Sequence, residues 1–303
     1  MVRFVAPRAL AATIGLALSP VAHGHTADTA SGVPSGLLAA LLLSLALYGV
    51  GYWRVHRTRN SGVARRNALS FLAGMALLAI ALLPPLDRWS TSSFAAHMLQ
   101  HELLILGAAP LLVVGRPLPI FLWSLPARAR RAAGSLSRAQ PWVWLWTAVT
   151  APLGGWLLHA LALWGWHVPA AFRAALATPW LHELQHVTFL TTALAFWWSL
   201  MMTRAAVQRG AAVLYLFTTT VHTSVLGALI TFATRPLYSP DLRATGAWDA
   251  LTDQQLGGLL MWVPGSAVYV GIGVLLLLQW VRRSEAGDPE RRAAAARTNA
   301  KVA

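Results

Sequence analysis

The chain has 303 residues, of which 56% are hydrophobic and only 11% are charged, and its formal net charge is +14. Soluble domains carry about a quarter charged residues, so this composition excludes an ordinary soluble domain and predicts a membrane protein. The arginines fall in loops between long uncharged stretches, which argues against a nucleic-acid-binding face. The absence of cysteine excludes disulfides, thiolate metal sites and iron–sulfur clusters.

The chain begins with a pattern typical of a secretion signal. Arg3 and Arg8 precede a short apolar run, and Ala22 and Gly24 supply small residues for cleavage. We therefore expect residues 1–24 to be removed as a signal peptide. Residues 25–33 would then form a short extracytoplasmic N-terminal segment.

Seven uncharged or nearly uncharged stretches follow, each of about 20 residues, which is the length that a helix needs to cross a bilayer. Backbone groups in lipid must satisfy their own hydrogen bonds, so each stretch should be helical. The predicted fold is therefore an all-α polytopic membrane helix bundle over residues 34–281. Its seven transmembrane helices are expected at 34–53, 67–86, 93–115, 142–164, 180–202, 211–233 and 257–281.

The distribution of arginine predicts the orientation of the bundle. Basic residues concentrate in segments 54–66, 116–141, 204–209 and 282–303, and basic loops stay in the cytoplasm. The N-terminus is thus expected outside, and residues 282–303 should form a disordered basic cytoplasmic tail. Segment 116–141 is apolar but interrupted by prolines, and we expect it along the inner interface. The expected location is the bacterial inner membrane.

Two copies of one motif, H-x-L-Q-H, open the third and fifth predicted spans on the outer side. They comprise His97 with His101 and His182 with His186. A spacing of four places two rings on one helix face, with their Cβ atoms about 6 Å apart. Two facing helices would then offer four imidazoles to one centre in the outer leaflet. We expect His167 and His222 as auxiliary ligands.

The residue types limit which metal ion or cofactor the histidines could bind. Imidazole suits zinc, copper, iron and nickel, whereas a thioether favours reduced copper. Met98 is thus a candidate soft ligand that favours copper, with simple packing as its alternative. An outer-leaflet haem and a metal-free role in helix contacts also stay open. The side chains expected to orient the ligands or handle protons are Glu102, Glu183, Gln100, Gln185 and Asp253.

The second copy, "HELQH", also matches the H-E-x-x-H pattern of zinc proteases. In the first copy Met98 stands where Glu183 stands in the second, so the glutamate is not part of the repeated element. A zinc protease also needs a third protein ligand, which Asp253 or His222 would have to supply. We therefore favour a non-enzymatic function over a protease.

Four blocks of sequence resemble one known family. They are "HMLQHELLILGAAPLLVVGRPLP", "WHVPAAFRAAL", "WLHELQHVTFL" and "DQQLGGLLMWVPG". Together they make residues 37–281 similar to the CtaG family of cytochrome c oxidase assembly factors, of the multi-span kind associated with caa-type oxidases. The family-like positions are His97, Gln100, His101, Gly115, Pro117, Trp166, His167, Pro169, His182, Gln185, His186, Asp253, Gln254, Trp262 and Pro264.

The resemblance implies an integral membrane assembly factor that helps copper reach the buried copper site of a haem–copper oxidase. Its expected partners are the oxidase subunits, membrane lipid and a periplasmic copper donor. The alternatives are an outer-leaflet haem- or metal-dependent membrane oxidoreductase and a metal-free scaffold for oxidase subunits.

Overall fold

The computed structural model describes residues 35–58, 65–202, 206–238 and 248–285. Within these ranges every regular element is a helix, which confirms the predicted all-α class. The expected signal peptide (1–24), the segment 25–33 and the tail beyond residue 285 lie outside the described residues. The last helix continues to Glu285, four residues past the predicted end of the bundle.

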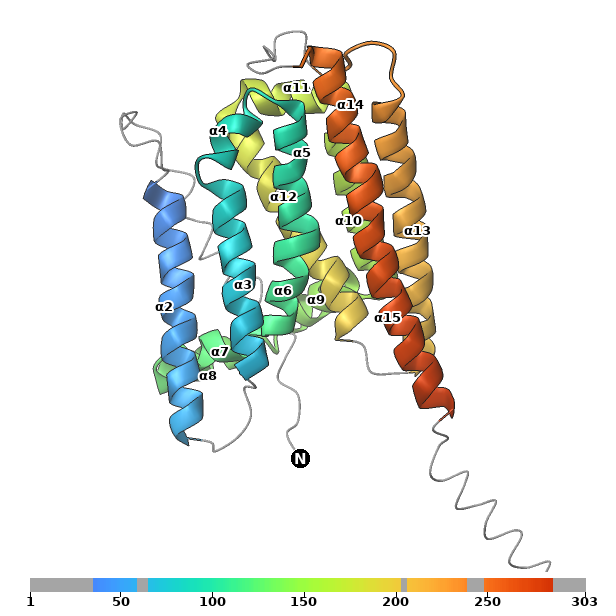
Figure 1. Ribbon diagram of the computed structural model, residues 1–303. Coiled ribbons are helices and arrows are strands. Elements are labelled where there is room, and N and C mark those ends of the chain that lie inside the picture. The colour runs from blue at the N-terminus through green and yellow to red at the C-terminus, as the bar shows by residue number, and fades with distance from the viewer. Residues whose placement is uncertain (1–34, 59–64, 203–205, 239–247, 286–303) are drawn as a thin grey trace, which may run out of the picture.

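Long helices run along the bundle, and short helices lie at its two ends (Figure 1). The short helices α4 and α11 define what we call the α11 end, and α7 and α8 define the α7 end. The bounds are α2 Ser35–Thr58, α3 Arg65–Leu82, α4 Leu86–Ser90, α5 Phe94–Glu102, η2 Leu103–Ala108, α6 Ala109–Gly115, α7 Pro117–Ser124, α8 Ala127–Leu136, α9 Gln140–Thr150, α10 Pro152–Trp166, α11 Pro169–Ala177, α12 Pro179–Met201, α13 Ala206–Thr231, α14 Ala250–Leu260, η3 Met261–Gly265 and α15 Ser266–Glu285.

Five helical stretches of the described chain are long and apolar enough to cross a membrane: 35–57, 65–82, 94–115, 211–231 and 250–279. The pair α9 and α10 makes a sixth if the two helices form one span. The predicted fifth span, α12, has 23 residues but is not among the five. Its first two turns carry His182, Glu183, Gln185 and His186, which lower its hydropathy. Length and composition thus support five or six of the seven predicted spans.

The segment predicted as one helix, 142–164, instead forms two helices, α9 and α10. The chain bends by 70° between α9 and α10. Ala151, at the bend, has extended backbone with ψ 143°, because the ring of Pro152 disfavours helical geometry in the residue before it. The prolines of segment 116–141 instead begin short helices, since Pro117 and Pro141 occupy first-turn positions that need no N–H donor.

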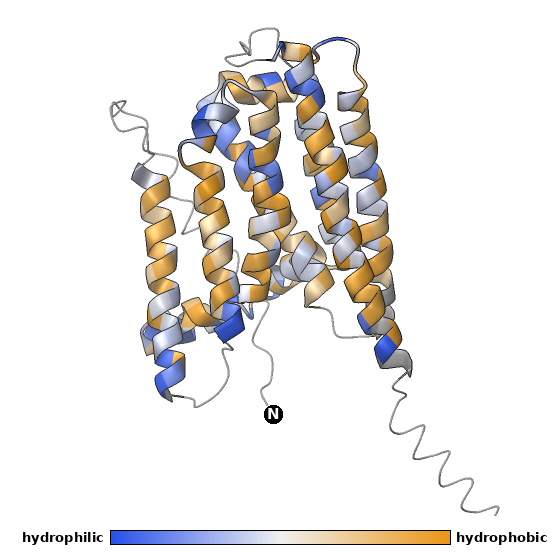
Figure 2. Ribbon diagram, in the orientation of Figure 1, coloured by the Kyte–Doolittle hydropathy of each residue, from blue (hydrophilic) through white to orange (hydrophobic). Residues whose placement is uncertain are grey.

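Aromatic side chains hold the centre of the bundle together. Phe189, Phe196 and Trp197 of α12 are fully buried and pack against Ile105 and Tyr269 from the two helices that contain π segments. The indole N–H of Trp197 donates to the carbonyl oxygen of Ile105, 2.8 Å away, within η2. Most residues of α2 and α3 are hydrophobic, and their hydrophilic residues gather toward the ends of the helices (Figure 2). This pattern fits helices that pass through lipid.

Candidate metal centre

Helices α5 and α12 each present a pair of imidazoles near the α11 end. The ring centroids of His97 and His101 lie 4.4 Å apart, and those of His182 and His186 lie 4.3 Å apart. The spacing of four residues thus places each pair on one face of its helix, as the sequence predicted.

The two pairs face one another across the helix interface. The ring centroid of His97 lies 5.2 Å from that of His182 and 6.3 Å from that of His186. The centroids of His101 and His186 lie 5.5 Å apart. His97 and His101 are buried, whereas His182 and His186 are partly buried. The repeated motif therefore brings four imidazoles into one cluster.

A fifth ring joins this cluster from the end of α10. The centroid of His167 lies 6.5 Å from that of His101, and His167 is buried. We call His97, His101, His167, His182 and His186 the five-histidine cluster.

Backbone carbonyls fix the tautomer of two of these rings. Nδ1 of His97 lies 3.2 Å from the carbonyl oxygen of Ser90, and Nδ1 of His167 lies 2.6 Å from that of Leu163. A carbonyl oxygen only accepts, so each Nδ1 carries the proton and each Nε2 keeps its lone pair. Metal-binding histidines commonly donate their other ring N–H in this way. A residue pattern does not reveal these partners, because every residue has a backbone carbonyl.

The cluster contains an unusual number of buried polar atoms without a hydrogen-bond partner among the described residues. They include Nε2 of all five histidines, Nδ1 of His101 and both amide atoms of Gln185. Each such atom costs about 1–3 kcal/mol if nothing pairs with it. The lone pairs therefore suit a bound cation.

As the side chains stand, no group of three or more His, Asp or Glu residues in the described ranges is placed to hold a metal ion. Metal–imidazole bonds are about 2 Å long, so the nitrogens that bind one ion must lie within about 4 Å of one another. The rings have to turn about their side-chain bonds before three nitrogens meet on one ion.

Asp253 of α14 positions the start of α5 rather than a histidine ring. Its carboxylate accepts hydrogen bonds from the Ser93 hydroxyl at 2.7 Å and from the backbone N–H groups of Phe94 and Ala95 at 2.6 and 3.3 Å. A negative charge at a helix N-terminus also interacts favourably with the helix dipole. Asp253 thereby holds the turn that leads into His97.

The neighbouring Gln254 and the loop after α13 support His167. Gln254 accepts from the backbone N–H of Leu237 at 2.6 Å, and this loop carries Tyr238. The phenol of Tyr238 donates to the carbonyl oxygen of His167, 2.9 Å away. Burial raises the pKa of Tyr238 to about 12, so the phenol keeps its proton. The sequence did not point to Tyr238, which lies far from the histidines along the chain.

The other residues that were predicted to orient the ligands or handle protons have mixed surroundings. The amide of Gln100 donates to the carbonyl oxygen of Ala81 at 2.7 Å and to Asp87 at 3.2 Å, so it ties α5 to the α3–α4 corner. Glu102 faces η3, where its Oε2 would lie 2.9 Å from a Cβ added to Gly265. Glu183 follows His182 on α12 and is partly exposed.

Two predicted ligands have contacts outside the five-histidine cluster. Met98 is fully buried and packs in an apolar group with Phe94, Phe172 and Met261. His222 of α13 instead contacts Trp156 and Trp164 of α10. Neither Asp253 nor His222 therefore stands beside the "HELQH" histidines as the third ligand of a zinc protease.

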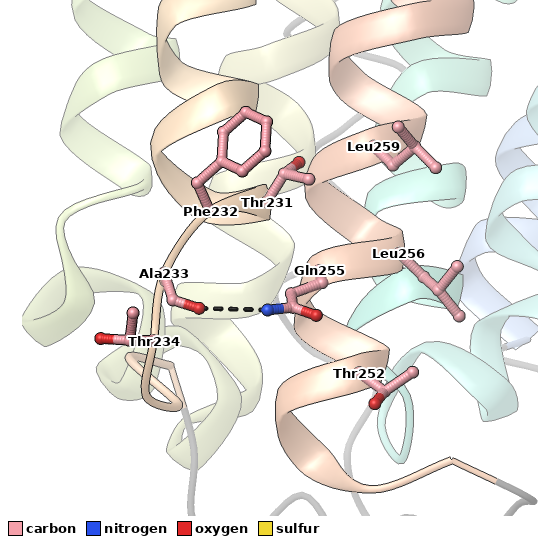
Figure 3. A pocket seen from close by; sticks show the side chains of 8 residues that line it. All are labelled: Thr231, Phe232, Ala233, Thr234, Thr252, Gln255, Leu256 and Leu259. Carbon is pink, nitrogen blue, oxygen red and sulfur yellow. Dashed lines mark hydrogen bonds between the residues drawn. The ribbon is translucent and has the colours of Figure 1, made fainter.

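A pocket of about 420 Å³ lies between the end of α13 and the start of α14. Figure 3 shows that it is lined by Thr231, Phe232, Ala233, Thr234, Thr252, Gln255, Leu256 and Leu259, with the Gln255 amide donating to the Ala233 carbonyl oxygen. None of the five cluster histidines lines this pocket, so it is separate from the candidate centre.

The chain is similar to several proteins of mycobacteria. The chain is 25% identical over 262 residues to an uncharacterised protein of Mycobacterium leprae, and 24% identical over 260 residues to uncharacterised proteins of Mycobacterium bovis and Mycobacterium tuberculosis. Each alignment covers 82% of this chain and 39% of the relative, so the chain spans about two fifths of their length. No solved structure matches.

The model of one protein family, the cytochrome c oxidase caa3 assembly factors, matches residues 46–283. This match includes all five cluster histidines together with Asp253 and Tyr238. It spans most of the helical bundle, and the chain therefore belongs to the cytochrome c oxidase caa3 assembly factor family.

Proposed function

We propose that this protein is an inner-membrane factor that carries copper toward the buried copper site of a haem–copper oxidase by means of the five-histidine cluster. Family membership supports the assembly role. The single observation that carries the copper role is the set of five imidazoles whose Nε2 atoms are buried without a partner.

The chemistry of the cluster favours a monovalent ion as cargo. The ligands that converge are neutral imidazoles, and burying an ion away from water is more costly as its charge rises. Reduced copper carries one charge, and imidazole is among its ligands. Because Met98 packs in an apolar group, the choice of copper rests on imidazole and on the family rather than on a thioether.

The spacing of the rings suits a transient carrier. Three nitrogens reach one ion only after the rings turn, so part of the binding free energy is spent on that adjustment. A site of this kind holds its ion less tightly than a preorganised tetrahedral site and releases it more readily. A protein that receives copper from a periplasmic donor and delivers it to an oxidase subunit requires such release.

The proposed orientation places the α11 end outside the cytoplasm. The arginines of α8 and of the end of α2 lie at the α7 end, and basic segments stay in the cytoplasm. We further propose that α12 is a seventh crossing, since 23 residues of helix extend about 35 Å. The five-histidine cluster then lies in the outer leaflet, within reach of an extracytoplasmic copper donor.

Copper analysis of the purified protein under reducing conditions tests the proposal. We expect stoichiometric copper in the natural chain and its loss in His101→Ala and His186→Ala. His56→Ala serves as the control, because His56 is exposed near the far end of α2 and contacts only Tyr52 among the ring contacts of the described residues. A natural chain that takes up no copper at any loading would overturn the copper role.

Two further measurements separate the alternatives. A Soret band that disappears in His101→Ala would support a haem-dependent oxidoreductase instead of a copper carrier. Unchanged oxidase activity in cells that carry His97, His101, His182 and His186 all as Asn would support a metal-free scaffold. We expect neither result.

A further inference from the structure

A second group of unpartnered polar atoms lies between α10 and α13, apart from the five-histidine cluster. The indole N–H of Trp164 donates to Nδ1 of His222, 3.3 Å away. Indole is a donor only, so Nδ1 accepts and the proton of neutral His222 stands on Nε2. Trp164 therefore fixes His222 as a hydrogen-bond donor.

Two donors at this place have no acceptor among the described residues. Nε2 of His222 and Nε1 of Trp156 are both buried and unpartnered. Their rings meet edge to face, with centroids 5.8 Å apart and planes at 81°. Each unpaired N–H inside a membrane costs free energy, so an intramembrane polar pair of this kind indicates a binding function.

The neighbouring His159 shows how a purely structural histidine is satisfied in the same bundle. One ring nitrogen of His159 pairs with the hydroxyl of Thr192 at 3.3 Å, and the other pairs with the phenol of Tyr269 at 3.4 Å. Both of its nitrogens are thus used. The contrast with His222 sets the Trp156–His222 pair apart from ordinary helix packing.

The pair lies beside the outward-facing surface of the bundle. On α10, Leu161 is 69% exposed and Trp164 is 39% exposed, while on α13 Val221 and Val225 are each 47% exposed. These apolar side chains face lipid when the helices cross a membrane. A ligand for the two donors therefore arrives from the hydrocarbon, not from water.

We propose that Trp156 and His222 bind the carbonyl oxygen of a lipid-soluble molecule of the quinone class. A carbonyl oxygen has two lone pairs and accepts from both donors at once. A flat conjugated ring also stacks favourably on indole. No electron transfer is part of this proposal, which concerns binding alone.

The depth of the pair favours a quinone over the ester carbonyl of a phospholipid. His222 lies nine residues before the end of α13 at Thr231, which is about 14 Å along the helix axis. Half of a bilayer's hydrocarbon core is about 15 Å thick. The ester carbonyls of lipids stay near the interface, whereas a quinone ring dissolves in the hydrocarbon itself.

Calorimetric titration of the full chain in lipid nanodiscs with decylubiquinone, a short-chain quinone, tests the site. We expect saturable binding that weakens at least fivefold in Trp156→Phe, which keeps an aromatic ring but loses the N–H. His222→Leu should weaken it similarly. His222→Gln, whose amide still donates, should restore much of the affinity. Trp144→Phe, at a tryptophan of α9 that is 71% exposed, is the matched control and should bind as the natural chain does.

Two lipid compositions show whether the bound carbonyl belongs to a quinone or to the ester group of a phospholipid. If a quinone is the occupant, its affinity should be the same in nanodiscs of ester-linked and of ether-linked phospholipid. Binding seen only in ether-linked lipid would show that ester carbonyls hold the site, and it would overturn the quinone assignment. Absence of binding in the natural chain, or equal affinity in Trp156→Phe and His222→Leu, would overturn the site altogether.

Discussion

At the scale of single residues, the site divides into side chains that the sequence could identify and backbone groups that it could not. The spacing of His97, His101, His182 and His186 predicted two rings on each helix face, and the ring distances agree. The orienting partners of His97 and His167 are the carbonyls of Ser90 and Leu163. Such contacts depend on where the chain turns, and no residue pattern encodes them.

Asp253 gives the first prediction at this scale. Replacing Asp253 with Asn removes the charge and one of the two oxygens that accept from Ser93, Phe94 and Ala95. We expect the free energy of unfolding to fall by about 1–3 kcal/mol, measured as a lower melting temperature in detergent. Copper occupancy should fall too, because His97 follows this turn.

The control for Asp253 is Asp249→Asn. Asp249 caps α14 by accepting from the backbone N–H of Thr252 at 2.7 Å, and asparagine caps a helix about as well as aspartate. We expect little change in stability or copper content. Equal behaviour of the two variants would contradict a special role for Asp253.

Tyr238 gives a pH-dependent prediction. Its folded pKa is raised from 10.0 to about 12 by burial, so its contribution to stability is complete below pH 10. That contribution is lost as the pH rises from 10 to about 12, because the unfolded chain ionises first. Tyr238→Phe cannot ionise, so the difference in melting temperature between the two chains should shrink over this range. A difference independent of pH would show that ionisation of this phenol does not affect the stability of the fold.

At the scale of elements, the spans were predictable where apolar runs are long. The bend and the π segments that interrupt the helices were not. The predicted 93–115 and 211–233 agree with the helical stretches 94–115 and 211–231, which are long and apolar enough to cross a membrane. The 70° bend before α10 follows from Pro152, whose effect on the preceding residue is not part of the apolar pattern that predicts a span. The π segments η2 and η3 have no composition of their own. They depend on tertiary contacts such as the bond from Trp197 to the Ile105 carbonyl.

The contact between α13 and α14 gives the element-scale prediction. A Cβ added to Gly258 would lie 2.6 Å from the Thr231 hydroxyl and 2.8 Å from the Gly227 carbonyl oxygen. Gly258→Ala must therefore push the two helices apart, and we expect a loss of about 1–3 kcal/mol in the free energy of unfolding. In Gly271→Ala the added Cβ meets nothing within 4 Å, and a helical alanine should leave stability unchanged or raise it slightly. A Gly258→Ala protein as stable as Gly271→Ala would show that this close packing is not needed.

At the scale of the whole molecule, charge and apolar surface together make the bundle a membrane protein with two distinct ends. Arg54 donates to the Ser124 carbonyl oxygen at 2.8 Å, and the guanidinium of Arg130 lies 4.3 Å from the Trp123 ring centroid. These contacts hold α7 and its basic neighbour α8 to the end of α2. Composition was enough to predict the class, since it depends on sums over the chain. The meeting of α5, α10 and α12 depends on tertiary packing, so composition alone did not predict that five histidines come together.

The orientation of the molecule is open to a direct test because the chain contains no cysteine. A single introduced thiol is then the only target for a maleimide reagent that does not cross membranes. Thr91→Cys, exposed beside α4 at the α11 end, should be labelled in intact spheroplasts. Ser135→Cys, exposed on α8 at the α7 end, should be labelled only after lysis. The opposite pattern would place the five-histidine cluster near the cytoplasm, where it could not receive copper from outside, and the proposed route of delivery would have to be reversed.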